Sequence, residues 1–435
     1  PVTGMLRRRS DTGSCSCESG DGGSPGFSRR AFLKRFAATG ALAGLSTQGM
    51  ATRLAFADGP YAGDVLVVLS LRGGFDGLNA IVPTADPAYS TWRPTVGIPQ
   101  SVLLPLDATF GMHPAMSALK PYWDAGTFGV VQAVGQPDPT RSHFEAMEAM
   151  ERAAPGTSAR TGWIDRTLGL RAAGTAFQGM QLGSGMAASS FTGPTPELAI
   201  WSVDSFELSG AWDATERQRW QQALRTVHDG SPTAIGGPAG TTLDALAKAA
   251  ELQAAGYTPA NGATYPDTDL GKALRDVARL VKADVGLQVA CVDYGDWDMH
   301  VDMGSADQGW LFDHLTELSG SLDAFATDLG NRFGDVTVVT LTEFGRRVEE
   351  NGSAGVDHGH GQAVLLLGGG VDGGKVHGSW PGLAEANLVD GDLAGTTDYR
   401  TILAEALEKR CGAGSLSTVF PNLPADRVGA FKTRV

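Results

Sequence analysis

Five short apolar runs, rich in β-branched residues, constrain the fold of this chain most strongly. Each run is nearly continuous and does not alternate with polar residues, which is typical of strands buried on both faces of a sheet. Segments with the apolar period of a helix lie between them, and this order predicts an α/β layered fold with a mostly parallel central sheet and helices on both faces. The predicted strands span residues 64–70, 127–134, 287–294, 336–342 and 363–367.

Five segments have the pattern of amphipathic or buried helices. The stretch from about 153 to 263 is rich in Gly, Ala, Ser and Thr and contains two of them. We therefore expect this stretch to form an insertion or cap beside the sheet. The predicted helices span residues 141–152, 215–227, 242–255 and 270–282, with a fifth around 323–328.

Residues 1–57 are organised like a twin-arginine export signal and are excluded from the fold, which leaves 58–435 as the folded domain. Arg29 and Arg30 precede a weakly apolar run, and an A-x-A cleavage pattern ends at Ala57. The run is far shorter than the roughly 20 residues of a membrane span, and we expect residues 1–27 to be disordered. The alternative is a basic amphipathic helix. The signal predicts export by the twin-arginine machinery to a periplasmic, cell-wall-associated or extracellular location.

The remaining chain is strongly acidic. Residues 1–57 hold eight of the 34 Lys and Arg residues and three of the 48 Asp and Glu residues, so 26 basic and 45 acidic residues remain, a net charge of −19. Such a surface argues against nucleic acid or anionic lipid as the main partner. It is compatible with a site that binds cations.

Carboxylates and imidazoles follow four of the five predicted strands. Ligands of open α/β sheets bind beyond the carboxyl ends of the strands, and Asp, Glu and His form the mixed oxygen and nitrogen set that suits zinc, manganese or similar ions. Alternatives stay open, because Asp76 also suits a turn and Ser142 a helix cap. Asp298 and His300 could be a surface pair, and Glu343 could pair with Arg346. The candidates are Asp76, Ser142, His143, Asp298, His300, Glu343, Asp357, His358 and His360.

A glycine-rich segment at 368–373 has the spacing G-x-G-x-x-G and follows the last predicted strand. A phosphate-binding loop also needs a helix N-terminus behind it. The following residues read as strand and turn, so the segment predicts a hairpin turn and no nucleotide site.

The motifs resemble those of the exported bacterial family known as domain of unknown function 1501, within the alkaline-phosphatase-like (sulfatase-like) superfamily. The resemblance covers essentially the whole chain and implies an alkaline-phosphatase-like fold. It rests on the leader and on RGGFDGLNAIVP at 72–83, RSHFEAM at 141–147, TGWIDR at 161–166, DWDMH at 296–300, TEFGRR at 342–347, DHGHG at 357–361 and GSWPGL at 378–383.

The resemblance also implies roles for the candidate residues. Asp76 is similar to the first metal ligand of the superfamily, and Ser142 to its nucleophile, with His143 and Thr140 as neighbours that could take that place. Glu343 departs from the superfamily pattern, because an Asp-His pair usually follows this strand. The remaining ligands for one or two divalent ions (zinc, manganese, calcium or magnesium) are Asp298, His300, Glu343, Asp357, His358 and His360.

The resemblance therefore implies an exported metal-dependent hydrolase or transferase that acts on a phosphate or sulfate ester of a small molecule or polymer. One alternative is a secreted binding or assembly protein with a degenerate site. Another is a hydrolase of a bond without phosphorus, which would use Ser142 or a metal-bound water.

Overall fold

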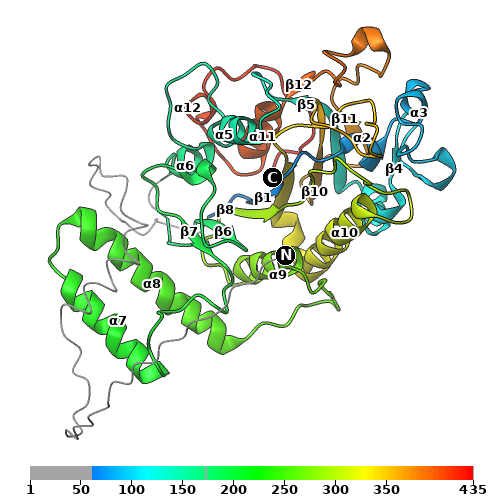
Figure 1. Ribbon diagram of the computed structural model, residues 1–435. Helices are drawn as coiled ribbons and strands as arrows, with labels where there is room; N and C mark the ends of the chain where they lie inside the picture. Colours follow the sequence, from blue (N-terminus) through cyan, green and yellow to red (C-terminus); the bar gives the residue numbers. More distant parts are fainter. Residues whose placement is uncertain (1–60, 172–173, 435) are drawn as a thin grey trace, which may run out of the picture. The chain divides into compact units, whose positions relative to one another are not determined.

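The computed structural model describes residues 61–171 and 174–434, and the predicted export signal at 1–57 lies outside them. A nine-stranded sheet crosses the described part of the chain in the order β11-β5-β10-β9-β1-β8-β6-β7, with β12 also paired to β5 (Figure 1). Its strands are β1 Val65–Leu71, β5 Phe128–Gly135, β6 Gly179–Leu182, β7 Leu198–Ile200, β8 Val289–Tyr294, β9 Val336–Leu341, β10 Gln362–Gly368, β11 Val376–His377 and β12 Thr397–Asp398. A small second sheet joins β2 Ile81–Val82, β4 Gly111–Met112 and β3 Leu104–Pro105.

Strand β10 alone runs against the direction of the other strands in the large sheet. It pairs antiparallel with both β5 and β9, whereas the remaining neighbours pair in parallel. The start of β10 therefore lies at the same edge as the carboxyl ends of β1, β5, β8 and β9. The loop before β10 reaches that edge, and the glycine-rich segment at 368–373 lies at the opposite one.

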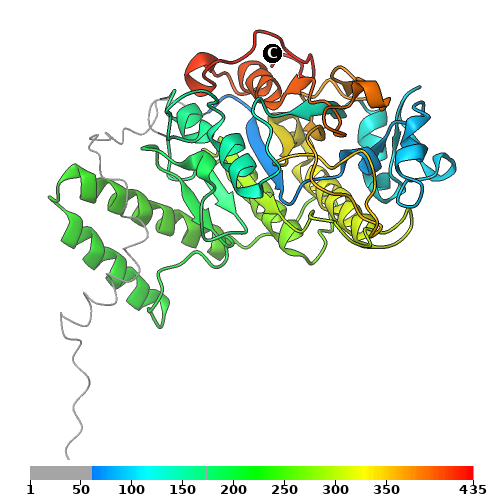
Figure 2. The same cartoon turned by 45° about the horizontal axis from the view of Figure 1, so that its top comes forward.

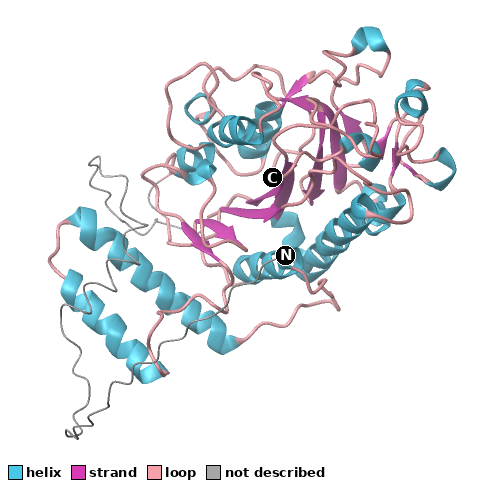
Figure 3. Cartoon of the chain, viewed as in Figure 1, coloured by secondary structure: helices cyan, strands magenta, loops and turns pink. Residues whose placement is uncertain are grey.

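Helices cover both faces of the sheet (Figures 2 and 3). Alternate residues of β1 point to opposite sides. Val65 and Val67 pack in one core with α9 (Asp269–Lys282) and α10 (Trp310–Leu329). Leu66 and Val68 pack in the other core with α6 (Trp163–Leu168) and α11 (Tyr399–Lys409). Each buried aliphatic side chain contributes about 1.5–3 kcal/mol through removal from water. The mostly parallel α/β fold with two helical layers is thus confirmed.

The α-helices vary from single turns to six turns. No helix within 61–171 and 174–434 is both long enough and apolar enough to span a membrane. The α-helices are α2 Gly77–Ala80, α3 Ala88–Trp92, α4 Lys120–Asp124, α5 His143–Arg152, α6 Trp163–Leu168, α7 Ala214–His228, α8 Thr233–Ala255, α9 Asp269–Lys282, α10 Trp310–Leu329, α11 Tyr399–Lys409 and α12 Leu416–Val419. The 3₁₀ helices are η1 Gln100–Val102, η2 Pro114–Leu119, η3 Ser189–Phe191, η4 Gly330–Asp335 and η5 Glu385–Asn387.

The five predicted strands coincide with β1, β5, β8, β9 and β10, whereas the stretch from 153 to 263 differs from the expectation. It adds β6 and β7 to the large sheet, and only α7 and α8 form a hairpin with a small core of their own around Leu224, Leu243 and Leu246. Strands of three and four residues in a Gly- and Ala-rich sequence have too little apolar periodicity to be recognised. The predicted helices at 242–255 and 323–328 are the final parts of the longer helices α8 and α10.

Helix α11 offers a test of the core on the side of the sheet that it covers. Ile402 is fully buried there, so Ile402→Ala should lower the free energy of unfolding by about 2–5 kcal/mol through lost burial and a cavity. Urea unfolding followed by circular dichroism measures the change. Ser417→Ala, at an exposed position of α12, is the control and should shift it by less than about 0.5 kcal/mol. An Ile402→Ala value as small as the control would contradict this packing.

Candidate metal centre

Three imidazole rings and one carboxylate converge at the sheet edge described above. The Nε2 atom of His358 lies 3.0 Å from Nε2 of His143, 2.9 Å from Nε2 of His300 and 3.0 Å from Oδ1 of Asp298. Asp298 in turn lies 2.9 Å from His300 and 3.5 Å from His143. His143, Asp298 and His358 have ligand atoms close enough together to hold one metal ion. His300 forms a second triangle with Asp298 and His358, so the two triangles share an edge.

The topology of the sheet explains why these residues meet. His143 begins α5 after β5, Asp298 and His300 follow β8, and His358 lies in the loop before β10. Since β10 runs antiparallel, the loop before it ends at the same edge as the loops that follow β5 and β8.

Each of the three rings is oriented by a hydrogen bond from its other nitrogen. A carboxylate or a backbone carbonyl only accepts hydrogen bonds, so each Nδ1 carries a proton and each ring turns its Nε2 atom into the cluster, where that atom would be the ligand of a bound metal ion. Metal-binding histidines in proteins are held in this way. The Nδ1 partners are Glu343 for His143 at 2.7 Å, Asp357 for His300 at 2.7 Å and the carbonyl oxygen of Arg141 for His358 at 2.9 Å.

The cluster fits a divalent metal ion. Nitrogen lone pairs and a carboxylate oxygen about 3 Å apart repel one another unless a proton or a cation lies among them. Ligands at about 2.0–2.1 Å from a tetrahedral ion would be separated by about 3.3 Å, close to the spacings found. The carboxylates of Asp298, Glu343 and Asp357 and the guanidinium of Arg346 carry a formal charge of −2, which a divalent cation balances.

The carboxyl groups of the cluster are acidic enough for this role. Partial burial acts to raise the pKa of Asp298, but the Arg346 guanidinium and the His358 ring lower it to about 2. The hydrogen bonds from His300 and Asn351 lower the pKa of Asp357 below its usual range. Both groups are therefore ionised at neutral pH.

The buried guanidinium of Arg346 ties together the loops that carry the ligands. It donates to the carbonyl oxygens of Gly74 at 2.7 Å, Trp297 at 2.9 Å and Val356 at 3.1 Å, and to Gly73. Its charge partner is Asp298 at 2.7 Å. The alternative that Glu343 forms an ion pair with Arg346 is therefore wrong, because Arg346 pairs with Asp298.

Two glycines allow the loop after β9 to lie against the loop before β10. A Cβ on Gly345 would lie 1.8 Å from the carbonyl oxygen of Gly361, and one on Gly359 would lie 2.5 Å from the carbonyl carbon of Arg346. Backbone hydrogen bonds of 2.9 and 2.8 Å join Gly345 to His360 and Gly359 to Gly345. This close contact fixes where His358 stands.

The structure does not bring every predicted residue into the cluster. Asp76 is buried and accepts a 2.6 Å bond from Arg93. Ser142 is the N-cap of α5, and its hydroxyl accepts from the backbone N–H of Glu145 at 3.5 Å. His360 lies 3.3 Å from the carbonyl oxygen of Gln136 and packs against Gly135 and Gly395. Glu343 and Asp357 stand behind the rings that they orient.

Some residues of the site were not identified from the sequence. The loop-tying role of Arg346 depends on carbonyl groups from segments far apart in the chain, and only its charge was visible in the motif at 342–347. Asn351 donates to Asp357 at 3.0 Å, and no motif signals it.

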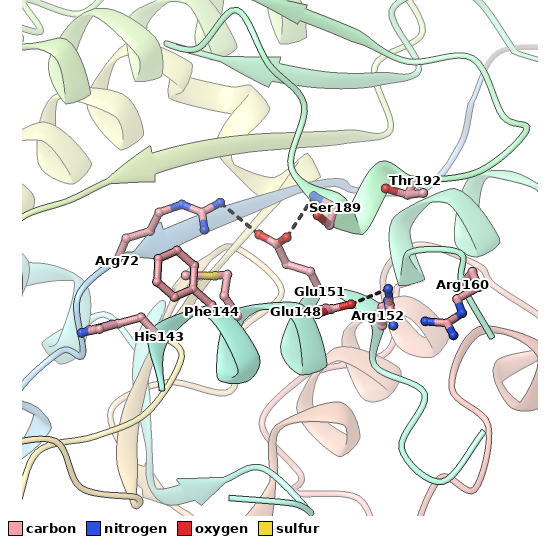
Figure 4. A pocket seen from close by; sticks show the side chains of 10 residues that line it. Arg72, His143, Phe144, Glu148, Glu151, Arg152, Arg160, Ser189 and Thr192 are labelled. Carbon is pink, nitrogen blue, oxygen red and sulfur yellow. Dashed lines mark hydrogen bonds and ion pairs between the residues drawn. The ribbon is translucent and has the colours of Figure 1, made fainter. Parts of the chain in front are cut away.

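The cluster is open to solvent and borders a cleft. The side chain of Asp298 is 45% exposed and that of His143 is 33% exposed. His143 also lines a cleft of about 490 Å³ that extends along α5 (Figure 4). A ligand can therefore reach the cluster from this side.

The carboxylates behind the rings generate a prediction on metal affinity. Glu343→Gln and Asp357→Asn remove the acceptor that fixes a ring's tautomer, so each should weaken metal binding about 10- to 100-fold. Competition with a chelating dye measures the affinity for zinc and manganese. Glu349→Gln, an exposed change in the same chain segment, should leave affinity unchanged. Unaltered affinity in both site variants would show that these carboxylates do not support a metal site.

None of the curated proteins matches the chain in sequence. Similar solved structures include the lipoteichoic acid synthase LtaP of Listeria monocytogenes, with 7% identity, a TM-score of 0.31, and 83% of this chain and 80% of that chain covered. A sulfatase of Pseudoalteromonas sp. has 12% identity, a TM-score of 0.34 and coverages of 86% and 70%. The alkaline phosphatase of the Antarctic bacterium TAB5 has 10% identity, a TM-score of 0.27 and coverages of 71% and 92%.

The sequence profile of one family matches residues 134–404, more than half of the chain. This stretch contains the segments that supply His143, Asp298, His300 and His358. The chain therefore belongs to the family described as "Protein of unknown function (DUF1501)", the family that its motifs resemble.

Proposed function

We propose that this protein is a metal-dependent hydrolase or transferase that acts on a phosphate or sulfate ester. The observation that supports it most is the convergence of His143, His300, His358 and Asp298 with every ring held by a hydrogen bond at Nδ1. A complete and oriented ligand set favours a working site over a degenerate one. The ester class rests on the resemblance of the motifs to the sulfatase-like superfamily.

The ligand types narrow the choice of metal. Imidazole nitrogen suits zinc, and the carboxylate of Asp298 in the same set also suits manganese, whereas calcium and magnesium prefer sites built from oxygen alone. A divalent ion bound here would stabilise negative charge on the transferred group and lower the pKa of a coordinated water or hydroxyl. We therefore propose zinc or manganese ahead of calcium or magnesium.

The chain's own groups support the binding of an ester anion. His143 is the first residue of α5, and the free N–H groups at a helix N-terminus attract negative charge. Arg346 is buried and pairs with Asp298. Its positive charge offsets part of the repulsion that the carboxylates of Asp298, Glu343 and Asp357 would exert on an anion.

The nucleophile is a separate question within the proposal. Ser142 remains the predicted nucleophile, and its Oγ would have to turn from the N–H of Glu145 toward the cluster to attack. If a water molecule attacks instead, Ser142→Ala should retain most of the turnover and lose only the stabilisation of a helix cap, about 1 kcal/mol.

Loss of His358 should remove both the bound metal and the turnover. His358→Ala removes the ring at the centre of the cluster, so bound metal should fall below about a tenth of the wild-type content and turnover should fall at least 100-fold, since the metal supplies the charge stabilisation. Elemental analysis and assays with phosphomonoester, phosphodiester and sulfate substrates measure both. His228→Ala on α7 is the matched control and should resemble the wild type.

Two results would count against the proposal. Full metal content in the His358→Ala, Asp298→Ala double variant would mean that the cluster does not hold the ion. A metal-loaded wild type without turnover on any ester of the panel would favour the binding or assembly protein.

We also propose that the protein is exported by the twin-arginine pathway, on the basis of residues 1–57. Export after folding would let the metal be chosen in the cytoplasm, where its availability is controlled, because affinity alone does not select the ion.

Replacing both Arg29 and Arg30 with Lys should retain the protein in the cytoplasm, because the export machinery reads the arginine pair. Cell fractionation with an antibody to the protein measures the distribution. Arg8→Lys with Arg9→Lys is the matched control. Normal export of the Arg29, Arg30 variant would refute this route.

A further inference from the structure

The cleft beside His143 contains groups that the proposed chemistry does not use. Figure 4 shows His143 at one end of the cleft and Arg160 toward the other, with the side chains of α5 between them. Two of its three arginines are neutralised. Arg72 pairs with Glu151 at 3.0 Å and with Asp293 at 2.9 Å, and Arg152 pairs with Glu148.

The third arginine is available to a ligand. Arg160 is exposed, and among residues 61–171 and 174–434 it has no ion-pair or hydrogen-bond partner for its guanidinium. On a chain with a net charge of −14, an unpaired guanidinium in a cleft is a local site for an anion. Guanidinium groups bind phosphate, sulfate and carboxylate groups through paired hydrogen bonds.

The loop of Arg160 is held in place rather than free. Arg166 donates to the carbonyl oxygens of both Thr161 and Arg152, which joins the residue next to Arg160 to the end of α5. The N–H of Gly162 donates to the carbonyl oxygen of Thr192 at 2.8 Å. Arg152, the last residue of α5, is nine residues from His143, a rise of about 13 Å along the helix. Figure 4 shows Arg160 beyond Arg152, at that end of the cleft.

An apolar surface lies between the two ends of the cleft. Phe144 is 89% exposed although it is aromatic, and Met147, three residues later, lies on the same side of α5 and also lines the cleft. Such a surface suits an apolar or sugar ring face.

We propose that Arg160 binds a second anionic group of the substrate, so that the substrate is an extended ester with at least two anionic groups. One phosphate or sulfate lies at the metal cluster, a ring packs on Phe144 and Met147, and the second anion lies at Arg160, beyond the last residue of α5. A phosphorylated or sulfated sugar chain has this chemistry. The inference rests on the proposed function for the reacting end only.

Kinetics with paired probes test the inference. The probes are a disaccharide with a phosphate or sulfate ester at each end, and 4-nitrophenyl phosphate and sulfate, which carry one anion. Arg160→Ala should raise KM about tenfold for the two-anion probe with kcat within twofold, and leave both constants for the one-anion probes unchanged. Arg160→Lys should recover part of the loss, because lysine keeps the charge without the paired hydrogen bonds. Arg219→Ala, an exposed change on α7, is the control.

A binding measurement separates this inference from the proposed function. Calorimetry with the same disaccharide and metal-free protein needs no turnover, and Arg160→Ala should weaken binding about fivefold or more. Affinity that is equal in wild type and Arg160→Ala would overturn the inference, as would equal KM effects on both kinds of probe. Loss of turnover on all probes with retained, Arg160-dependent binding would instead contradict only the proposed function.

Discussion

The buried guanidinium of Arg346 is the interaction on which the site depends. A buried charge is costly unless it is paired and all its donors are satisfied, and Arg346 meets both conditions only when three loops lie in one arrangement. Its partners are carbonyl oxygens at Gly73 and Gly74 after β1, at Trp297 after β8 and at Val356 before β10, together with the carboxylate of Asp298. Moving any of these loops would leave a donor unsatisfied, so the ligand-bearing loops are held as one unit.

The arrangement of the candidate metal ligands follows from that unit. Once Asp298 is fixed by Arg346, His358 and His300 lie within 3.0 Å of it, and Glu343 and Asp357 set the direction of the neighbouring rings. The ring nitrogens and the carboxylate oxygen therefore already lie at the spacing that one bound cation would need. Pre-organisation of this kind lowers the cost of binding a metal.

The candidate site and the cleft share helix α5, and this helix connects the two proposals. Its first residue, His143, belongs to the cluster, and Phe144 and Met147 line the cleft that leads toward Arg160. A substrate that reached from one end of α5 to the other would be bound at two points along one helix. Rigid placement of distant contacts lets binding energy hold the reacting group in position.

Local sequence pattern determined much of this protein. The apolar runs specified five of the strands, because strands buried on both faces need continuous apolar residues, and the clusters at 298–300 and 357–358 stood out because carboxylates and imidazoles rarely gather for packing. The pattern did not reveal β6 and β7, which are too short. It also did not distinguish the ring of His143, which joins the cluster, from that of His360, which does not.

Only the tertiary structure decided those questions. Contacts between residues far apart in the sequence decide the direction of β10, the partner of Asp76 and the convergence on His358. These contacts are hydrogen bonds and ion pairs. Periodicity and spacing describe neighbours along the chain. Which distant side chains meet is set by packing and by the need to satisfy buried polar groups.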